Sequence, residues 1–263
     1  MSATIETGHR TAAGRRAVGW ASAAPLTARG TRRGIREGEA VVAVGLPILF
    51  FLCLYAPIHN AVPDYAQFLL PVVLVQSCLF SAILAAANAG TDIRGAISDR
   101  FLSLPIPRTA PAVARLAGVV IRTVLSMAAA LAIAAAFGFR FHGDAGELLL
   151  FLAVPLVLTA ALSMLTDALG QVLADPDAAS QVLVVPQLVL TMLSTGIVPS
   201  SGFPDWIRPF VDHQPVTVYV ELLRSLAAGD GIDRGIAAAC WTAGLVLCGV
   251  LALRAAGRRE ARR

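Results

Sequence analysis

The sequence predicts an all-α, polytopic membrane protein with six transmembrane helices, a short amphipathic helix on the cytoplasmic side, and a helical hairpin on the outer side. Of the 263 residues, 57% are hydrophobic and only 14% are charged, against about 25% charged in an ordinary soluble domain. Six separate apolar runs approach or exceed the roughly 20 residues needed to cross a bilayer. The arginines cluster at the ends of these runs, as in membrane proteins.

The six runs set the domain organisation. They cover residues 40–58, 66–88, 110–139, 147–171, 180–198 and 235–253. The fifth run is short and contains Pro186, which lacks a backbone N–H and favours a kink. We therefore expect an Arg-rich cytoplasmic tail at 1–38, one six-span domain at 39–254, and a second Arg-rich cytoplasmic tail at 255–263.

The distribution of arginine predicts the orientation. Seven arginines precede the first run, five lie between the second and third runs or just inside the third, and five follow the sixth. The other side carries only Arg140, Arg208, Arg224 and Arg234. Because cytoplasmic loops carry the excess of basic residues, both termini are expected in the cytoplasm.

The sequence lacks the residues that several classes of function require. The chain has no lysine, which excludes a P-loop ATPase site and Schiff-base chemistry. Its arginines flank apolar runs and form no nucleic-acid-binding face. No H-E-x-x-H or G-x-S-x-G motif supports an intramembrane hydrolase. His59, His142 and His213 come from separate loops without shared spacing, so no metal site is expected. We therefore expect a protein that is not an enzyme.

The segment 91–107, between the second and third runs, is apolar at helical spacing. Ile93, Ile97, Phe101 and Leu104 form a stripe that the prolines at 105 and 107 end. This pattern predicts an amphipathic helix at the cytoplasmic membrane surface. Without further information, such a helix either contacts a partner or only caps the loop.

The outer loop 199–234 contains two further helical patterns. Residues 203–208 predict a short helix with proline in its first turn and tryptophan at the membrane interface. From Pro215, an apolar stripe of Val216, Tyr219, Val220, Leu223 and Ala227 predicts a second helix, in which Glu221 and Arg224 can pair. Together they predict a hairpin dipping into the outer leaflet. Its candidate residues are Pro199, Pro204, Trp206, Pro215, Glu221, Arg224 and the C-terminal cap Gly229.

Five polar residues lie inside the predicted spans. Arg122 and Asp167 are the deepest ionisable ones. They either form a salt bridge, or Arg122 extends to the inner headgroups, or one serves a substrate or proton. Gln76, Gln187 and Thr191 either hydrogen-bond between helices or contact a substrate.

A family resemblance rests on the two non-spanning segments. T-D-I-R-G at 91–95 and D-R-F-L-S-L-P-I-P-R at 99–108 closely resemble the loop after the second span of type 2 ABC exporter permeases, in particular the daunorubicin/doxorubicin-resistance (DrrB-like) branch. G-I-V-P at 196–199, P-D-W-I-R at 204–208 and P-V-T at 215–217 are similar to that family's second hallmark. The resemblance covers about residues 38–254, with Leu102 where the branch usually has arginine.

The resemblance implies a division of labour between chains. The amphipathic helix would be a coupling helix that docks on a separate ABC ATP-binding subunit. This chain would bind no cofactor, because ATP and Mg²⁺ would bind to that partner. A second permease, identical or related, would complete an exporter in the lipid of the bacterial plasma membrane. Its cargo would be an amphipathic drug, lipid or lipid-like metabolite. The alternative is a non-transporting immunity or assembly protein with this fold. The implied ATPase contacts are Thr91, Asp92, Arg94, Gly95, Asp99, Arg100, Phe101, Leu104, Pro105 and Arg108.

Overall fold

The computed structural model describes residues 39–60, 64–94, 110–173 and 175–260. Its elements in chain order are α3 (Glu39–Ile58), α4 (Tyr65–Arg94), α6 (Ala110–Ala136), α7 (Ala145–Leu173), α8 (Pro176–Met192), η1 (Ser200–Gly202), α9 (Arg208–His213), α10 (Pro215–Ala228) and α11 (Gly235–Glu260). The described parts of the chain are thus helices joined by turns and short irregular segments.

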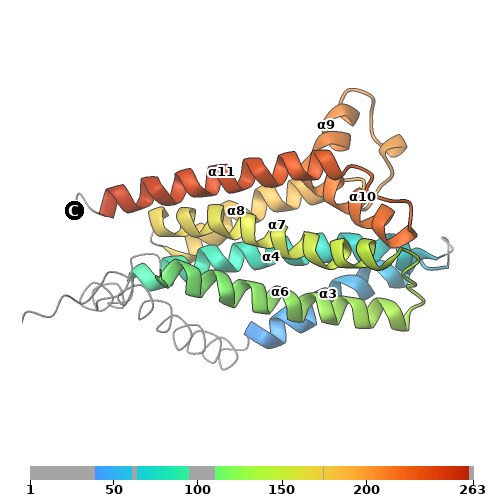
Figure 1. Cartoon of the computed structure of the whole chain (residues 1–263), viewed down its shortest axis with the longest axis horizontal. Coiled ribbons are helices and arrows are strands. Elements are labelled where there is room, and N and C mark those ends of the chain that lie inside the picture. Colours follow the sequence, from blue (N-terminus) through green and yellow to red (C-terminus); the bar gives the residue numbers. More distant parts are fainter. Residues whose placement is uncertain (1–38, 61–63, 95–109, 174, 261–263) are drawn as a thin grey trace, which may run out of the picture.

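The long helices run side by side along the long axis of the molecule (Figure 1). The helices α3, α6 and α8 begin at the end of the bundle where α4, α7 and α11 finish, whereas α9 and α10 lie at the opposite end (Figure 1). This alternation is the arrangement expected of a chain that crosses a membrane repeatedly. We call the end with α9 and α10 the hairpin end.

Five helices in the described ranges are long and apolar enough to cross a membrane. These candidate spans are Val41–Ile58, Tyr65–Thr91, Arg115–Ala136, Ala145–Leu173 and Gly235–Ala255. They coincide with five of the six predicted runs. The remaining predicted run, the fifth in chain order, corresponds to α8, which has only 17 residues.

The helix α4 forms the centre of the bundle. It packs against α3, α6, α7, α8 and α10, and its run of core residues includes Leu69, Leu70, Val73 and Leu74, each at most 1% exposed. A continuous apolar run of this kind is buried on all sides, unlike an amphipathic surface helix. The helix that precedes the predicted coupling segment therefore packs against five other helices, as α7 also does.

Helix ends at the two ends of the bundle have sequence-encoded caps. Asp144 and Glu147 bond reciprocally to each other's backbone N–H at 2.7 and 2.8 Å, a capping box that starts α7. Asp175 accepts from the N–H groups of Asp177 and Ala178 and starts α8. The predicted cap Gly229 ends α10 in the left-handed conformation, with φ +81°.

Three predicted boundaries were wrong. The third run ends as helix at Ala136, because the chain reverses at Gly138, where φ is +98°. The fifth ends at Met192 instead of residue 198, since backbone groups beyond that point bond to side chains of α10. The short outer helix is α9 at Arg208–His213, preceded by a turn. Arg208 holds that turn by donating to the carbonyls of Ser200 and Phe203.

Candidate functional site

The predicted coupling segment lies mostly outside the described residues. This applies to Gly95, Asp99, Arg100, Phe101, Leu104, Pro105 and Arg108. Thr91, Asp92 and Arg94 continue α4 as its last turn, so the predicted helix does not begin at Thr91. Residue 91 bonds back within α4, with its hydroxyl 2.8 Å from the carbonyl of Asn88.

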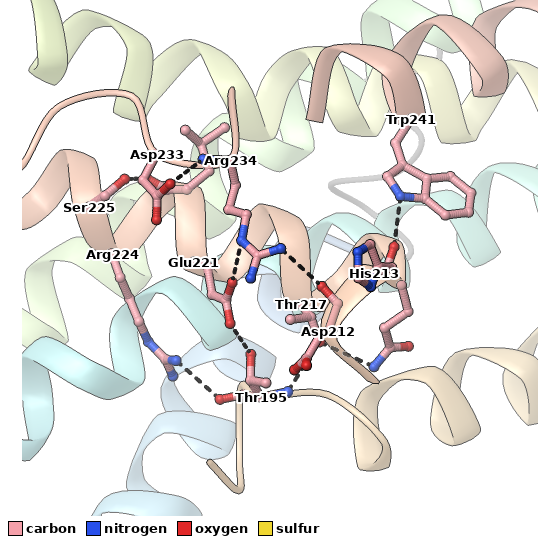
Figure 2. A network of polar contacts seen from close by, with 12 residues as sticks. Thr195, Asp212, His213, Thr217, Glu221, Arg224, Ser225, Asp233, Arg234 and Trp241 are labelled. Carbon is pink, nitrogen blue, oxygen red and sulfur yellow. Dashed lines mark hydrogen bonds and ion pairs between the residues drawn. The ribbon is translucent and has the colours of Figure 1, made fainter. Parts of the chain in front are cut away.

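At the hairpin end, an irregular segment after α8 is surrounded by polar side chains of α10 and its neighbours (Figure 2). Residues 193–197 have left the helix, yet Ser194, Thr195 and Gly196 are buried. Buried backbone groups without helical partners must be satisfied elsewhere, most strictly at membrane depth. The side chains described next supply those partners.

Gln214 and Thr217 hold the first part of this segment. The side-chain nitrogen of Gln214 donates to the carbonyl of Leu193 at 2.5 Å. The hydroxyl of Thr217 accepts from the N–H of Thr195 at 3.1 Å. Both residues are buried at the start of α10, so the start of this helix fixes the end of α8.

Arg224 holds the second part and also contacts α4. Its guanidinium donates to the carbonyls of Thr195 and Gly196 at 3.1 and 3.0 Å, and to that of Phe68 at 3.2 Å. It also lies 3.5 Å above the centroid of the Phe68 ring, a cation–π contact. Burial lowers the pKa of Arg224 to about 10, against an opposing effect of Glu221 and Tyr65. The side chain therefore remains charged at neutral pH.

Glu221 pairs with Arg234 and not with the predicted partner Arg224. The Glu221 carboxylate lies 3.1 Å from the Arg234 guanidinium, which precedes α11, and accepts from the hydroxyl of Thr195 at 3.0 Å. Arg234 also donates to the carbonyl of Asp212 at 3.4 Å. Figure 2 shows these contacts converging between α10 and the segment that leads into α11. We call Thr195, Thr217, Glu221, Arg224 and Arg234 the hairpin-end network.

The other residues predicted for the outer hairpin lie outside the hairpin-end network. The predicted stripe of α10 is buried, with each of its five members at most 4% exposed. Pro199 precedes η1, Pro204 precedes the turn before α9, and Pro215 opens α10. Trp206 is 80% exposed, in keeping with a membrane-interface position.

Asp167 pairs with Arg115, so a salt bridge with Arg122, one of the three alternatives for these two residues, was wrong. The Asp167 carboxylate accepts from two guanidinium nitrogens of Arg115 at 2.7 and 2.9 Å. It also accepts from Gln171 at 2.8 Å. This bidentate contact joins α6 to α7.

Gln76 and Thr191 join α4 to α8. The Thr191 hydroxyl donates to the side-chain oxygen of Gln76 at 2.9 Å, and both residues are buried. This contact corresponds to the first of the two alternatives for these residues, a hydrogen bond between helices. Gln187, one helical turn earlier in α8, is also buried, and its side-chain oxygen has no hydrogen-bond partner in the described structure.

Sequence reasoning missed Arg115, Phe68, Thr195 and Arg234 as interaction partners. Arg115 and Arg122 lie seven residues apart and therefore on the same face of α6. Periodicity could not choose between them. Thr195 lies next to the G-I-V-P motif, which was the one available signal for it. No local pattern indicates that Phe68 would lie beneath Arg224, because they are 156 residues apart.

A protein-family model supplies the first comparison. The model described as "ABC-2 family transporter protein" matches residues 54–254. The match runs from near the end of α3 to the last part of α11 and includes the whole hairpin-end network.

Named proteins supply the second comparison. The chain is 32% identical over 203 residues to the doxorubicin resistance ABC transporter permease protein DrrB of Mycobacterium tuberculosis, covering 73% of this chain and 70% of that protein. It is 27% identical to the probable doxorubicin resistance permease DrrC of the same organism, over 79% of this chain and 78% of that protein. The daunorubicin resistance permease DrrB1 of Streptomyces coeruleorubidus is 28% identical over 80% and 73% of the two chains.

Proposed function

The chain belongs to the ABC-2 transporter family, and we propose that it is the membrane-spanning permease subunit of an exporter driven by ATP hydrolysed on another chain. The observation that carries the proposal is the family match over residues 54–254, together with relatives that are named drug-resistance permeases. The absence of lysine supports the division of labour, because a P-loop requires that residue.

The proposed mechanism passes through α4. The segment after α4 carries the coupling motif and contacts the ATP-binding subunit, so movement of that subunit displaces the end of α4. Since α4 packs against α3, α6, α7, α8 and α10, the displacement is transmitted to most of the bundle. The hairpin-end network ties α4, α10 and the end of α8 together at the far end. Export would require this end to rearrange when cargo leaves.

Six membrane crossings are part of the proposal. The helix α8 follows α7 in the opposite direction and leads to the hairpin end (Figure 1). Counting α8 together with the five candidate spans gives six crossings. An even number of crossings places both termini in the cytoplasm, in agreement with the arginine distribution. The protein would then lie in the bacterial plasma membrane, with η1, α9 and α10 at its outer face.

The proposed cargo is an amphipathic drug, a lipid or a lipid-like metabolite. The named relatives carry doxorubicin or daunorubicin resistance in their names, and these are the first compounds to test. The proposed assembly contains two permeases and two ATP-binding subunits. The second permease is either a copy of this chain or a related protein.

Co-purification with an ABC ATP-binding subunit encoded beside this chain tests the proposal. We expect the two proteins to purify together from detergent, and the permease to increase ATP hydrolysis by the partner. Cells that lack the permease should accumulate more daunorubicin than cells that express it. An ATPase that neither binds nor responds to this chain, with unchanged drug accumulation, would favour the alternative of a non-transporting immunity or assembly protein.

A further inference from the structure

The two helices of the predicted outer hairpin differ in what they expose. The helix α10 is packed inside the bundle, with its apolar stripe buried. The segment before it, residues 204–213, instead carries two large aromatic side chains on its surface, because Trp206 is 80% exposed and Phe210 is 50% exposed. Of the two helices, α9 with the turn before it is therefore the part that presents large apolar side chains outward.

Trp206 and Phe210 belong to one face of a helical segment. Helical hydrogen bonding begins one turn before α9, where the N–H of Arg208 donates to the carbonyl of Pro204 at 3.2 Å. Side chains four residues apart in a helix are neighbours, so the two rings form one surface, which we call the outer aromatic surface. Val211 lies on a different face of the segment and is completely covered by the protein.

Two hydrogen bonds hold the end of α9 beside the start of α11. The indole Nε1 of Trp241 donates to the carbonyl of His213 at 3.0 Å, and Arg234 donates to that of Asp212 at 3.4 Å (Figure 2). Trp241 lies about 9 Å along α11 from its first residue, Gly235. In agreement with these contacts, α9 projects to the side of α11 and not beyond the end of the bundle (Figure 1).

The helix beside the outer aromatic surface is a candidate membrane span. Little of this span, Gly235–Ala255, is buried in the structure. Its large exposed side chains include Ile236, Leu247 and Leu251. An apolar helix with so little protein cover is suited to a lipid environment. Because α9 lies against the side of this helix, the lipid around α11 also reaches the outer aromatic surface.

The chemistry of the segment fits the boundary between lipid and water. Asp205 and Arg208 form an ion pair at 2.8 Å, with the Asp205 side chain 91% exposed. An exposed ion pair is costly in the hydrocarbon core, but not among head groups and water. Tryptophan is enriched at the same boundary, since its ring is apolar and its N–H is polar. The charged pair and the two rings are therefore both accommodated at the depth of the head groups.

We propose that the outer aromatic surface binds phospholipid and anchors α9 at the membrane boundary beside α11. Trp206 and Phe210 contact the upper parts of the acyl chains, while Asp205 and Arg208 stay among the head groups. The occupant is the bilayer and not a second copy of this chain, because the surface lies beside a candidate span and has an interfacial composition. Its assignment to the outer leaflet rests on the proposed six-span topology; the contact with lipid does not.

Tryptophan fluorescence of the full-length chain in phosphatidylcholine nanodiscs tests the proposal. In Trp20→Phe/Trp241→Phe, Trp206 is the one tryptophan left of the three in the chain. We expect phosphatidylcholine brominated near the head group to quench its emission more strongly than the same lipid brominated near the chain end. Iodide in the buffer should quench it only weakly.

A tryptophan placed on α11 is the matched control for depth. Leu247→Trp, in a chain whose three native tryptophans are replaced by phenylalanine, lies about 18 Å along α11 from Gly235. This is near the middle of a hydrocarbon core about 30 Å thick, so bromine near the chain end should quench it more strongly. Since Trp241→Phe removes the bond to His213, Trp20→Phe is also compared with Trp20→Phe/Trp206→Phe. Their difference gives the quenching of Trp206 with that bond intact.

The three quenchers separate the possible surroundings of Trp206. Quenching by iodide and by neither brominated lipid would place the side chain in water. Quenching by none of the three would place it against protein, as in contact with a second copy of the chain. Either result would overturn the proposal. Stronger quenching by bromine near the chain end would contradict the placement at the head groups.

Two variants of Phe210 test whether the rings act as one surface. Phe210→Asp should reduce the quenching of Trp206 by brominated lipid and increase quenching by iodide, because a carboxylate draws the segment toward water. Phe210→Leu keeps an apolar side chain and should retain the lipid quenching. Undiminished lipid quenching in Phe210→Asp would refute a shared surface.

These measurements need neither ATP nor a partner chain, so they are independent of transport. Lipid quenching of Trp206 in a chain that supports no export would refute the proposed function alone. Export by a chain in which Trp206 is not quenched by lipid would refute the lipid-binding surface alone.

Discussion

At the scale of residues, charged side chains in this bundle contact backbone and one another across large sequence distances. Arg224 satisfies three carbonyl groups and covers an aromatic ring. Asp167 accepts from both Arg115 and Gln171. Such contacts offset the cost of burying polar groups among apolar helices. Removing them should therefore lower the free energy of unfolding more than it lowers the transport rate.

Reversing the ion pair between α6 and α7 tests its assignment. Asp167→Arg alone should destabilise the protein by about 3 kcal/mol, because one partner of a mostly buried pair is left with a like charge. The double variant Arg115→Asp/Asp167→Arg should recover much of this loss, measured by unfolding in detergent. The matched double variant Arg122→Asp/Asp167→Arg should recover none. Equal recovery in both would contradict the Arg115–Asp167 pair.

Arg224 makes contacts that only a planar guanidinium provides. Lysine keeps the charge but cannot reach the carbonyls of Phe68, Thr195 and Gly196 together. Arg224→Lys should therefore lower the free energy of unfolding by about 1 to 3 kcal/mol. The control is Arg140→Lys at an exposed position, which should leave the melting temperature in detergent unchanged. A similar melting temperature for both variants would show that the planar shape of the Arg224 guanidinium does not contribute to stability.

At the scale of elements, the two ends of the bundle are held differently. The hairpin end depends on polar contacts, whereas small residues allow α4 and α7 to approach closely at the other end. A Cβ atom on Gly170 would overlap the carbonyl oxygen of Ala86 and lie 3.0 Å from the Cβ of Ala89. One on Gly90 would lie 2.9 Å from the nitrogen of Pro176. The end of α4 therefore directly contacts both α7 and α8.

A methyl group at this contact should separate the helices. Gly170→Ala is expected to destabilise the protein by about 1 to 3 kcal/mol through overpacking. The control is Gly244→Ala in α11, where an added Cβ meets nothing within 4 Å and alanine improves helix propensity. Thermal unfolding in detergent should lower the melting temperature for the first variant and not for the second. A neutral Gly170→Ala would indicate that α4 and α7 can move apart without cost.

If the predicted coupling segment contacts the ATP-binding subunit, reversing its charges should abolish export without affecting folding. Asp99→Arg/Arg100→Asp should abolish ATP-dependent export and leave membrane insertion and the yield of purified protein unchanged. The matched control Arg140→Asp/Asp230→Arg, at two exposed positions on the hairpin end, should retain export. Export is measured in inside-out vesicles with daunorubicin. Undiminished export by the first variant would exclude the assignment of this segment to coupling.

At the scale of the whole molecule, α8 decides the number of crossings. Its 17 residues span about 26 Å at 1.5 Å per residue, slightly less than a hydrocarbon core of about 30 Å. In the proposed six-span topology, the irregular segment that follows would complete the distance. Its buried backbone is satisfied by Gln214, Thr217 and Arg224. This is the condition under which non-helical backbone is tolerated at membrane depth.

Cysteine accessibility tests whether α8 crosses. In a variant without the four native cysteines, a cysteine at Ser201 should react with a membrane-impermeant maleimide on intact cells. A cysteine at Asp177, exposed in the first turn of α8, should react only after permeabilisation. Both positions are tested again after permeabilisation, as a control for reactivity. Labelling of both positions on intact cells would contradict six crossings and cytoplasmic termini.

The sequence by itself determined the helical class of the part of the chain that the structure describes, five helices long and apolar enough to cross a membrane, the buried face of α10 and the cap at Gly229. Apolar runs, periodicity and capping are local properties, so a sequence can carry them. It also carried the motifs of the family. Only the tertiary structure decided which of two arginines on one face of α6 meets Asp167, that Glu221 pairs with Arg234, and that α8 ends at Met192. These outcomes depend on contacts between residues far apart in the chain, and no spacing within a single helix contains that information.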